Sequence, residues 1–422
     1  MATPSSAQGF EPDAPPPYIA TAGAEHRFPL LGRNQKHWGS LAVTSAARSA
    51  RSIPLFYEED RLQGTFELAD SQSTQSISSI KVSVLGSVVT GPLVDDTAVF
   101  LKLPAVLWSR KTSTGHAGHR AWPFSIPLPR EVIVGDTAYA LPESFLERHT
   151  RLSVIYEMSV VVSRGMFRPD YTFKTRFRYV PCTQPTPPST LRQHAYALGL
   201  PLPGPTDDLE GWQTFETVMA HGHVFKSRQA VVRCTLSLAT PHSYTRGGPI
   251  PCYLTLESGD LPALDFFADP AAVRARLRRC VHYQGVGLSS MQQHIDSSRE
   301  FVDVAFAVWW KLNREGRPDD NPHTRTLEGE IHVPADVVAS ARMHVADFSI
   351  SYSIELLPSS CIQFTPTSQA PLLSVPVTIA TMYPTHAPRP VVYAAPSYEN
   401  EPSTDTRRND AITYTQLTGL RR

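Results

Sequence analysis

The sequence carries no excess charge of either sign and few cysteines. Its 422 residues include 39 basic and 39 acidic side chains, so the formal net charge is zero. A neutral chain is not a general binder of nucleic acid, and any contact with a polyanion must be local. The cysteines are odd in number and never spaced as Cys-x-x-Cys: Cys182, Cys234, Cys252, Cys280 and Cys361. Reduced thiols, as in a cytosolic protein, fit this pattern.

Long apolar runs are also missing, and we expect no leader sequence. The first residues are polar and rich in proline, unlike a signal peptide. No run of about 18 apolar residues is present, so we expect no membrane span. We therefore expect a cytoplasmic protein.

The motifs of common enzymes are absent as well. The sequence contains no Gly-x-Ser-x-Gly, His-Glu-x-x-His, Walker loop or Gly-x-Gly-x-x-Gly. His116 with His119, and His221 with His223, lie close together, but no cysteine or carboxylate cluster accompanies them, so we interpret them as surface histidines. We expect no catalytic residue, no cofactor and no metal.

The strongest positive signal is a β-hairpin between Ser153 and Pro181. Both arms alternate with period two, and Gly165 and Pro169 lie between them. Apolar residues alternate along each arm and predict its buried face: Val154, Tyr156, Met158, Val160 and Val162 in the first, and Tyr171, Phe173, Phe177 and Tyr179 in the second. In the second arm a strand places three cations in one row on the opposite face: Lys174, Arg176 and Arg178.

Short runs of the same kind recur along the chain without long amphipathic helices between them. This pattern predicts an all-β protein of two tandem immunoglobulin-like β-sandwich domains with disordered tails. The expected limits are a tail at 1–27, a first sandwich at 28–182, a proline-rich linker at 183–206, a second sandwich at 207–385 and a tail at 386–422.

The second half contains another row of cations. After a helical turn at Asp269–Pro270, alternation predicts a strand that carries Arg274, Arg276 and Arg278 on one face. The run 301–310 also alternates, so we expect one shared face for Val302, Val304, Phe306, Val308 and Trp310.

The two halves echo each other in sequence. Phe124-Ser-Ile-Pro-Leu-Pro, a following serine and Tyr156 have counterparts in Gly329-Glu-Ile-His-Val-Pro, Ser340 and Tyr352. Two related sandwiches in tandem would produce this repetition.

Several of these motifs, in this order, resemble the arrestin-like proteins of the α-arrestin group, in the form found in fungi. They are Tyr57-Glu-Glu-Asp-Arg-Leu-Gln-Gly-Thr-Phe-Glu-Leu68, Ser79-Ile-Lys-Val-Ser-Val-Leu-Gly86, Leu141-Pro-Glu-Ser-Phe145, and the hairpin that ends at Tyr179-Val-Pro181. The resemblance covers roughly residues 38–385. It implies two sandwiches joined by a hinge and no catalytic centre. Thr175 stands where receptor-binding arrestins carry a phosphate-sensing arginine, which argues against that trigger.

A ligand motif precedes the first strands. Pro15, Pro16 and Tyr18 fit the pattern Pro-Pro-x-Tyr, in which prolines preset the polyproline II helix and reduce the entropy lost on docking to a WW domain. Pro396 and Tyr398 form a degenerate version. The α-arrestin resemblance implies that such a motif recruits a HECT-type ubiquitin ligase. The alternative is a proline-rich tail with a chance tyrosine.

The two rows of cations have two interpretations. Guanidinium groups pair bidentately with carboxylate or phosphate, so the rows could bind acidic or phosphorylated tails of cargo. The alternative is the solvated outer face of a sheet.

These observations predict a trafficking adaptor. It would bind cytosolic tails of membrane proteins, recruit the ligase to plasma membrane or endosomes, and promote ubiquitination and endocytosis of the cargo. Peripheral association with membranes is compatible with this role, and binding of nucleic acid is not expected. The alternative is a coat or endosomal sorting scaffold of arrestin fold, like the arrestin-fold subunit of retromer, that recruits no ligase.

Overall fold

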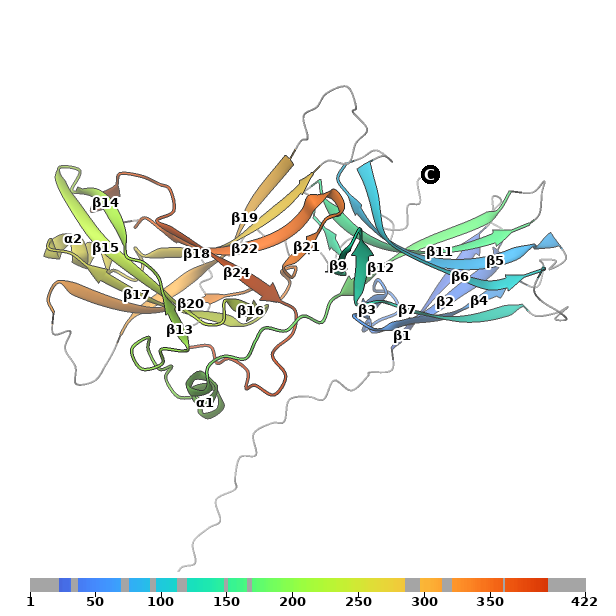
Figure 1. Ribbon diagram of the computed structural model, residues 1–422, viewed down its shortest axis with the longest axis horizontal. Helices are drawn as coiled ribbons and strands as arrows, with labels where there is room; N and C mark the ends of the chain where they lie inside the picture. Colours follow the sequence, from blue (N-terminus) through green and yellow to red (C-terminus); the bar gives the residue numbers. More distant parts are fainter. Residues whose placement is uncertain are drawn as a thin grey trace, which may run out of the picture.

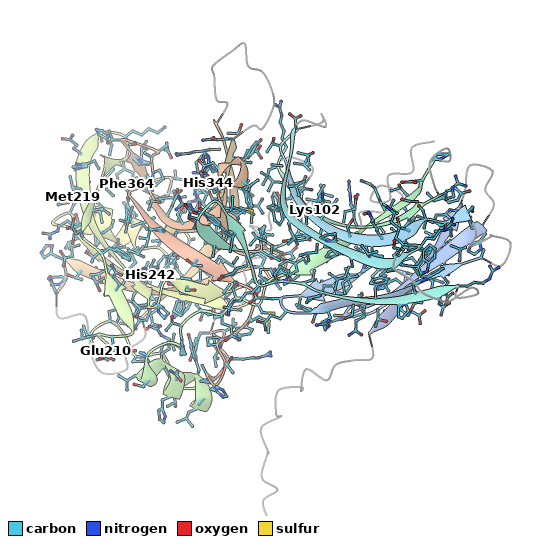
Figure 2. The ribbon with its side chains drawn as sticks, turned by 45° about the vertical axis from the view of Figure 1, so that its right-hand side comes forward. Lys102, Glu210, Met219, His242, His344 and Phe364 are labelled. Atoms are coloured by element: carbon cyan, nitrogen blue, oxygen red, sulfur yellow. The ribbon has the colours of Figure 1, made fainter. Side chains whose placement is uncertain are left out.

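The computed structural model describes residues 23–31, 37–69, 76–91, 96–111, 120–147, 151–164, 169–284, 297–312, 321–359 and 361–393. These residues form an all-β fold with large curled sheets, consistent with a β-sandwich. In Figure 1 the strands before residue 181 lie on the right and those after residue 211 lie on the left. Side chains fill the space between the sheets (Figure 2).

Two sheets make up most of the first half. One has the strand order β1-β2-β4-β7, and the other has the order β3-β12-β11-β5-β6, with β10 paired to β11. A separate hairpin joins β8 and β9. The bounds are β1 Ala24–Leu31, β2 His37–Ser45, β3 Leu55–Tyr57, β4 Arg61–Leu68, β5 Ser79–Val89, β6 Thr97–Ser109, β7 Ala121–Pro127, β8 Glu131–Val134, β9 Thr137–Ala140, β10 Phe145–Leu146, β11 Ser153–Ser163 and β12 Tyr171–Val180.

The predicted hairpin is confirmed as the antiparallel pair β11 and β12, with Tyr156 opposite Phe177. The apolar face predicted for β11 is buried, from Val154 to Val162, because alternate side chains of a strand point into the core. Thr175 shares the buried face of β12 and is 3% exposed.

The second half forms one 12-stranded sheet with the order β16-β24-β22-β18-β19-β20-β17-β15-β14-β23, in which β13 pairs with β15 and β21 with β22. The bounds are β13 Trp212–Thr214, β14 Val218–Val224, β15 Arg228–Ala239, β16 Ser243–Thr245, β17 Pro249–Glu257, β18 Arg274–Gln284, β19 Ser297–Lys311, β20 Thr324–His332, β21 Ala341–Met343, β22 Phe348–Leu357, β23 Phe364–Pro366 and β24 Leu373–Ala380. A short 3-10 helix, Val345–Asp347, precedes β22.

The strand order of the first half recurs in the second. The order β3-β12-β11-β5-β6 corresponds to β16-β24-β22-β18-β19, and in both series the first pair is parallel while the rest are antiparallel. Likewise β1-β2-β4-β7 corresponds to β14-β15-β17-β20.

The same hydrogen bonds also occur at matching places. The Tyr156 hydroxyl donates to the carbonyl of Pro142 over 2.7 Å, and the Tyr352 hydroxyl donates to that of Val338 over 2.6 Å. Each pair is separated by 14 residues. Two serines, Ser144 and Ser340, accept from the second strand of each series, from Tyr179 N of β12 and from Ile379 N of β24. The sequence echo therefore corresponds to repeated local structure.

Helices are short in the described part of the chain. Helix α1, Thr190–Leu198, begins after Ser189, whose side chain caps it, and ends at Gly199, which has a φ of 63°. The positive φ favours glycine as the residue that ends this helix. Helix α2, Leu261–Phe267, follows Asp260, whose carboxylate caps it. None of the described helices is long and apolar enough to cross a membrane.

Two predicted boundaries and the description of the linker need correction. Residues 24–27, assigned to the tail, belong to β1, which pairs with β2. The predicted linker contains α1, and the guanidinium of Arg192 on this helix is buried against the carbonyls of Thr240 and Gly211. Residues 386–393, assigned to the second tail, are part of the described structure, and Tyr393 contacts β20.

The face predicted for the run 301–310 is wrong. Val304 and Trp309 are both buried, although they are five positions apart and a regular strand would place them on opposite faces. The pairing of β18 with β19 skips Val304, because Leu277 faces Ala305 and Arg278 faces Asp303. This β-bulge reverses the alternation, so Val308 and Trp310 lie on the face opposite to Val304.

Candidate functional site

The predicted ligand motifs lie outside the described residues. This applies to Pro15, Pro16 and Tyr18 and to the second set, Pro396 and Tyr398. The pair His116 and His119 is also outside.

The first row of cations lies on the outer face of β12. Lys174 forms an ion pair with Glu157 of the neighbouring strand, with 2.9 Å between Nζ and Oε1, and its side chain remains 58% exposed. Arg176, directly opposite Glu157 in the register, is half-buried, as is Arg178. The row is therefore partly neutralised at one end.

The other end of this row faces the second half of the chain. Arg176 and Arg178 line a pocket of about 70 Å³ together with Glu143 and with Asp336 and Val338. An anion that reached these arginines would enter between the two halves.

Two ion pairs near this pocket connect the halves. Arg246, next to β16, donates to both carboxylate oxygens of Glu143 over 2.9 and 3.0 Å. Arg279 of β18 pairs with Glu147 through two hydrogen bonds of 2.7 and 2.5 Å. Glu143 and Arg279 are 5% and 4% exposed, so both contacts are largely shielded from solvent.

Arg279 is held by more than one group. Burial alone would lower its pKa, but the Glu147 carboxylate outweighs that effect, and the pKa is raised. Its guanidinium also lies 5.5 Å from the centroid of the Phe145 ring. The arginine therefore stays charged within the contact between the halves.

The second row of cations is not an open basic surface at two of its three positions. Arg276 donates to Glu355 over 2.7 and 2.9 Å and to Asp303 over 2.8 Å. Arg278 lies 3.5 Å from each of the same carboxylates. Arg274 is exposed and lies over the Phe306 ring. The carboxylates come from the two flanking strands, so the prediction of a cargo-binding row here is wrong for Arg276 and Arg278.

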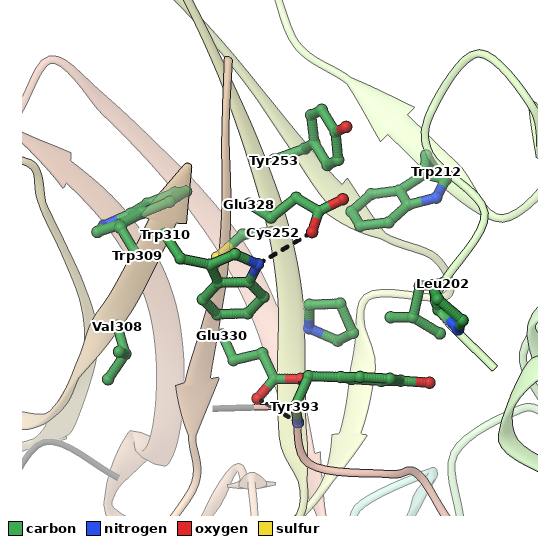
Figure 3. Close-up of a pocket in the computed structure, with 13 residues that line it drawn as sticks. Leu202, Trp212, Cys252, Tyr253, Val308, Trp309, Trp310, Glu328, Glu330 and Tyr393 are labelled. Atoms are coloured by element: carbon green, nitrogen blue, oxygen red, sulfur yellow. Dashed lines mark hydrogen bonds between the residues drawn. The ribbon is translucent and has the colours of Figure 1, made fainter. Parts of the chain in front are cut away.

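A second pocket was missed by sequence reasoning. It has a volume of about 420 Å³ and lies on the outer face of β17, β19 and β20 (Figure 3). The strand register places Trp310, Glu328 and Tyr253 side by side across these strands. Residues before β13 and the segment at Tyr393 complete the walls. No sequence pattern indicated this pocket, because the bulge at Val304 decides that Trp310 points outward.

Two carboxylates lie in this pocket. Glu328 accepts a hydrogen bond from Trp310 Nε1 over 3.0 Å. Glu330, only 1% exposed, accepts from the backbone N–H of Tyr393 and lies 3.1 Å from Nε2 of His332. The Tyr393 hydroxyl donates to the carbonyl of Leu200 over 2.6 Å, which ties the segment around Tyr393 to the segment between β12 and β13.

The described residues contain no group of His, Cys, Asp and Glu that could hold a metal ion. Burial raises the pKa of the Cys234 thiol to about 12 and that of Cys252 in the same direction. Such thiols stay protonated near neutral pH and are poor nucleophiles.

No family model matches this chain, and no curated protein matches it.

Proposed function

We propose that the chain is an arrestin-like trafficking adaptor with two tandem immunoglobulin-like sandwiches. The observation that carries the proposal is the recurrence of one strand order, with matching tyrosine and serine hydrogen bonds, in both halves. This recurrence agrees with the paired sandwiches that the α-arrestin resemblance implies.

In this proposal the Pro-Pro-x-Tyr motif binds a WW domain of a HECT-type ubiquitin ligase. Tyr18 occupies the tyrosine pocket, while Pro15 and Pro16 supply preordered apolar contacts. The chain itself performs no chemistry. It holds a membrane protein by a cytosolic tail, and the ligase then modifies that cargo at the plasma membrane or endosomes.

The cargo surface is assigned to the first row of cations. Lys174 is largely exposed, and Arg176 and Arg178 line the pocket between the halves. Acidic or phosphorylated tails carry the complementary charge. Arg276 and Arg278 are left out, because Asp303 and Glu355 already neutralise them.

Capture of the ligase from a lysate tests the motif. The full chain should recover a WW-domain ligase, and Tyr18→Ala should lose it, because the tyrosine pocket is then empty. Tyr398→Ala, in the degenerate motif, is the matched control and should keep most of the ligase. The readout is mass spectrometry of the captured proteins.

A peptide of residues 11–20 provides the direct measurement. It should bind a WW domain with a micromolar Kd, about −8 kcal/mol. Equal capture by wild type and Tyr18→Ala, with equal peptide affinities, would favour the coat or sorting scaffold that recruits no ligase.

A further inference from the structure

The pocket beneath Tyr393 has the form of a built ligand site. It lies on a sheet face that would otherwise be open to solvent, and two rows of side chains form its floor. Trp310, Glu328 and Tyr253 make one row, and Val308, Glu330 and Pro251 make the next. Its volume of about 420 Å³ lies within the range of roughly 300–1,000 Å³ that small-molecule sites occupy.

Aromatic rings line the pocket on several sides. Figure 3 shows Trp310 on one side, Trp212 across from it, Tyr393 along the lower edge and Tyr253 at the top. Trp212 already interacts with the Arg192 guanidinium, 5.0 Å from its ring centroid. Trp310 and Tyr393 are less buried than Trp212 and Tyr253, so their rings are the more accessible to a ligand. The faces of such rings are electronegative and attract cations.

The charges in the pocket have one sign. Glu328 and Glu330 both line it, while no lysine, arginine or histidine is among the described residues that do so. His332 contacts Glu330 but does not line the pocket itself. A neutral proline-rich peptide would gain from the aromatic walls but not from these carboxylates. A cation would gain from both.

We propose that this pocket binds an organic ammonium cation, held by the faces of Trp310 and Tyr393 and by the carboxylate of Glu328, with the buried Glu330 adding negative charge to the floor. The ammonium group would come from a free small molecule or from a lipid headgroup, which share this chemistry. The site is independent of the ligase motif and of the cargo row. A negative result at this pocket would therefore leave the proposed function unchanged.

Choline and its uncharged carbon analogue, 3,3-dimethyl-1-butanol, test the proposal because they share a shape and differ in charge. Isothermal titration of the full chain should give saturable binding of choline. Because the analogue lacks the cation–π and carboxylate interactions, it should bind at least about tenfold more weakly. Quenching of tryptophan fluorescence should follow the same titration.

Two variants locate the binding. Glu328→Gln keeps an oxygen that can accept from Trp310 Nε1 but removes the charge, and it should reduce the preference for choline over the analogue. Trp310→Leu should abolish choline binding. Glu67→Gln, the same change on an exposed part of β4, is the matched control and should bind choline like wild type. Far-UV circular dichroism confirms that each variant is folded.

Phosphatidylcholine vesicles distinguish the two sources. Sedimentation with vesicles that free choline reverses would identify a lipid headgroup, and choline binding without sedimentation would identify a free cation. The proposal is overturned if choline fails to saturate, if choline and its analogue bind equally, or if folded Glu328→Gln keeps the full preference.

Discussion

At the scale of single residues, the environment of His26 holds a neutral imidazole. The side chain is 2% exposed, its Nδ1 lies 3.2 Å from the carbonyl of Ala50, and its Nε2 lies 2.8 Å from Ser45 Oγ. The carbonyl must accept, so the proton resides on Nδ1. Ser45 Oγ already accepts from the backbone N–H groups of Ala47 and Leu55, so it donates its own proton to Nε2.

Protonation of His26 should therefore destabilise the fold. Burial lowers its pKa below 6.5, and the same cause lowers that of His242. Between the lowered pKa and 6.5 the unfolded chain binds more protons than the folded chain, so stability rises with pH there. The contribution is fully present above 6.5 and is lost as the pH falls below that value.

Thermal unfolding between about pH 7.5 and about pH 5.5 measures this effect. The Tm of wild type should fall as the pH decreases, and His26→Gln should fall less steeply. His221→Gln, at an exposed histidine, is the control and should follow the wild-type curve. Parallel curves for His26→Gln and wild type would contradict the interpretation.

At the scale of elements, β12 and β18 carry similar rows of cations in different surroundings. On β18 the flanking strands contribute Asp303 and Glu355, and the side chains of Arg276 and Glu355 are 14% and 11% exposed. On β12, Lys174 forms an ion pair with Glu157 of the neighbouring strand, and the lysine is mostly exposed.

Charge reversal should reduce the free energy of unfolding more on β18 than on β12. Arg276→Glu places a third carboxylate beside Asp303 and Glu355 and should cost about 3 kcal/mol of unfolding free energy. Lys174→Glu should cost less than about 1 kcal/mol, because exposed ion pairs contribute little. Urea unfolding measures both, and equal losses would show that the two surroundings do not differ in energy.

Charge reversal on β12 should affect the binding of cargo rather than the stability of the fold. Reversal of Lys174, Arg176 and Arg178 to Glu should abolish binding of an acidic or phosphorylated cargo peptide, and wild-type binding should weaken with added salt. Fluorescence anisotropy of the peptide gives the affinity. Unchanged affinity in the folded triple variant would remove this row from the cargo surface.

At the scale of the whole molecule, the described residues include well-buried polar contacts that join the halves. Glu143 accepts from Arg246 and from the backbone N–H of Ala339 over 3.0 Å. Arg279 pairs with Glu147. The hydroxyl of Thr381 donates to the carbonyl of Pro181, which begins the segment between β12 and β13.

Removal of Glu143 should weaken this contact. Glu143→Ala leaves Arg246 without its carboxylate and Ala339 N–H without its acceptor, so unfolding should become easier by about 3 kcal/mol. The calorimetric transition should also broaden or split, because the halves lose a shared contact. Glu67→Ala, on an exposed site, should change stability by less than about 0.5 kcal/mol. A single unshifted transition for Glu143→Ala would mean that other contacts hold the halves together.

Local pattern was sufficient for the hairpin, for the strand β18 and for the repeat. Alternation in the runs that became β11, β12 and β18 separated the inward faces from the faces that carry the cations, because period two follows from strand geometry alone. The echo around Tyr156 and Tyr352 was visible as spacing, and the structure places both hydroxyls on equivalent carbonyls.

Tertiary structure decided the sites. Asp303 and Glu355 neutralise Arg276 although they lie 27 and 79 residues away along the chain, a pairing that only the strand register creates. The bulge at Val304 turns Trp310 away from the core, and Tyr393 completes its pocket from a segment predicted to be a tail. Sequence fixes periodicity within a strand, whereas the partner across a strand depends on how distant segments align.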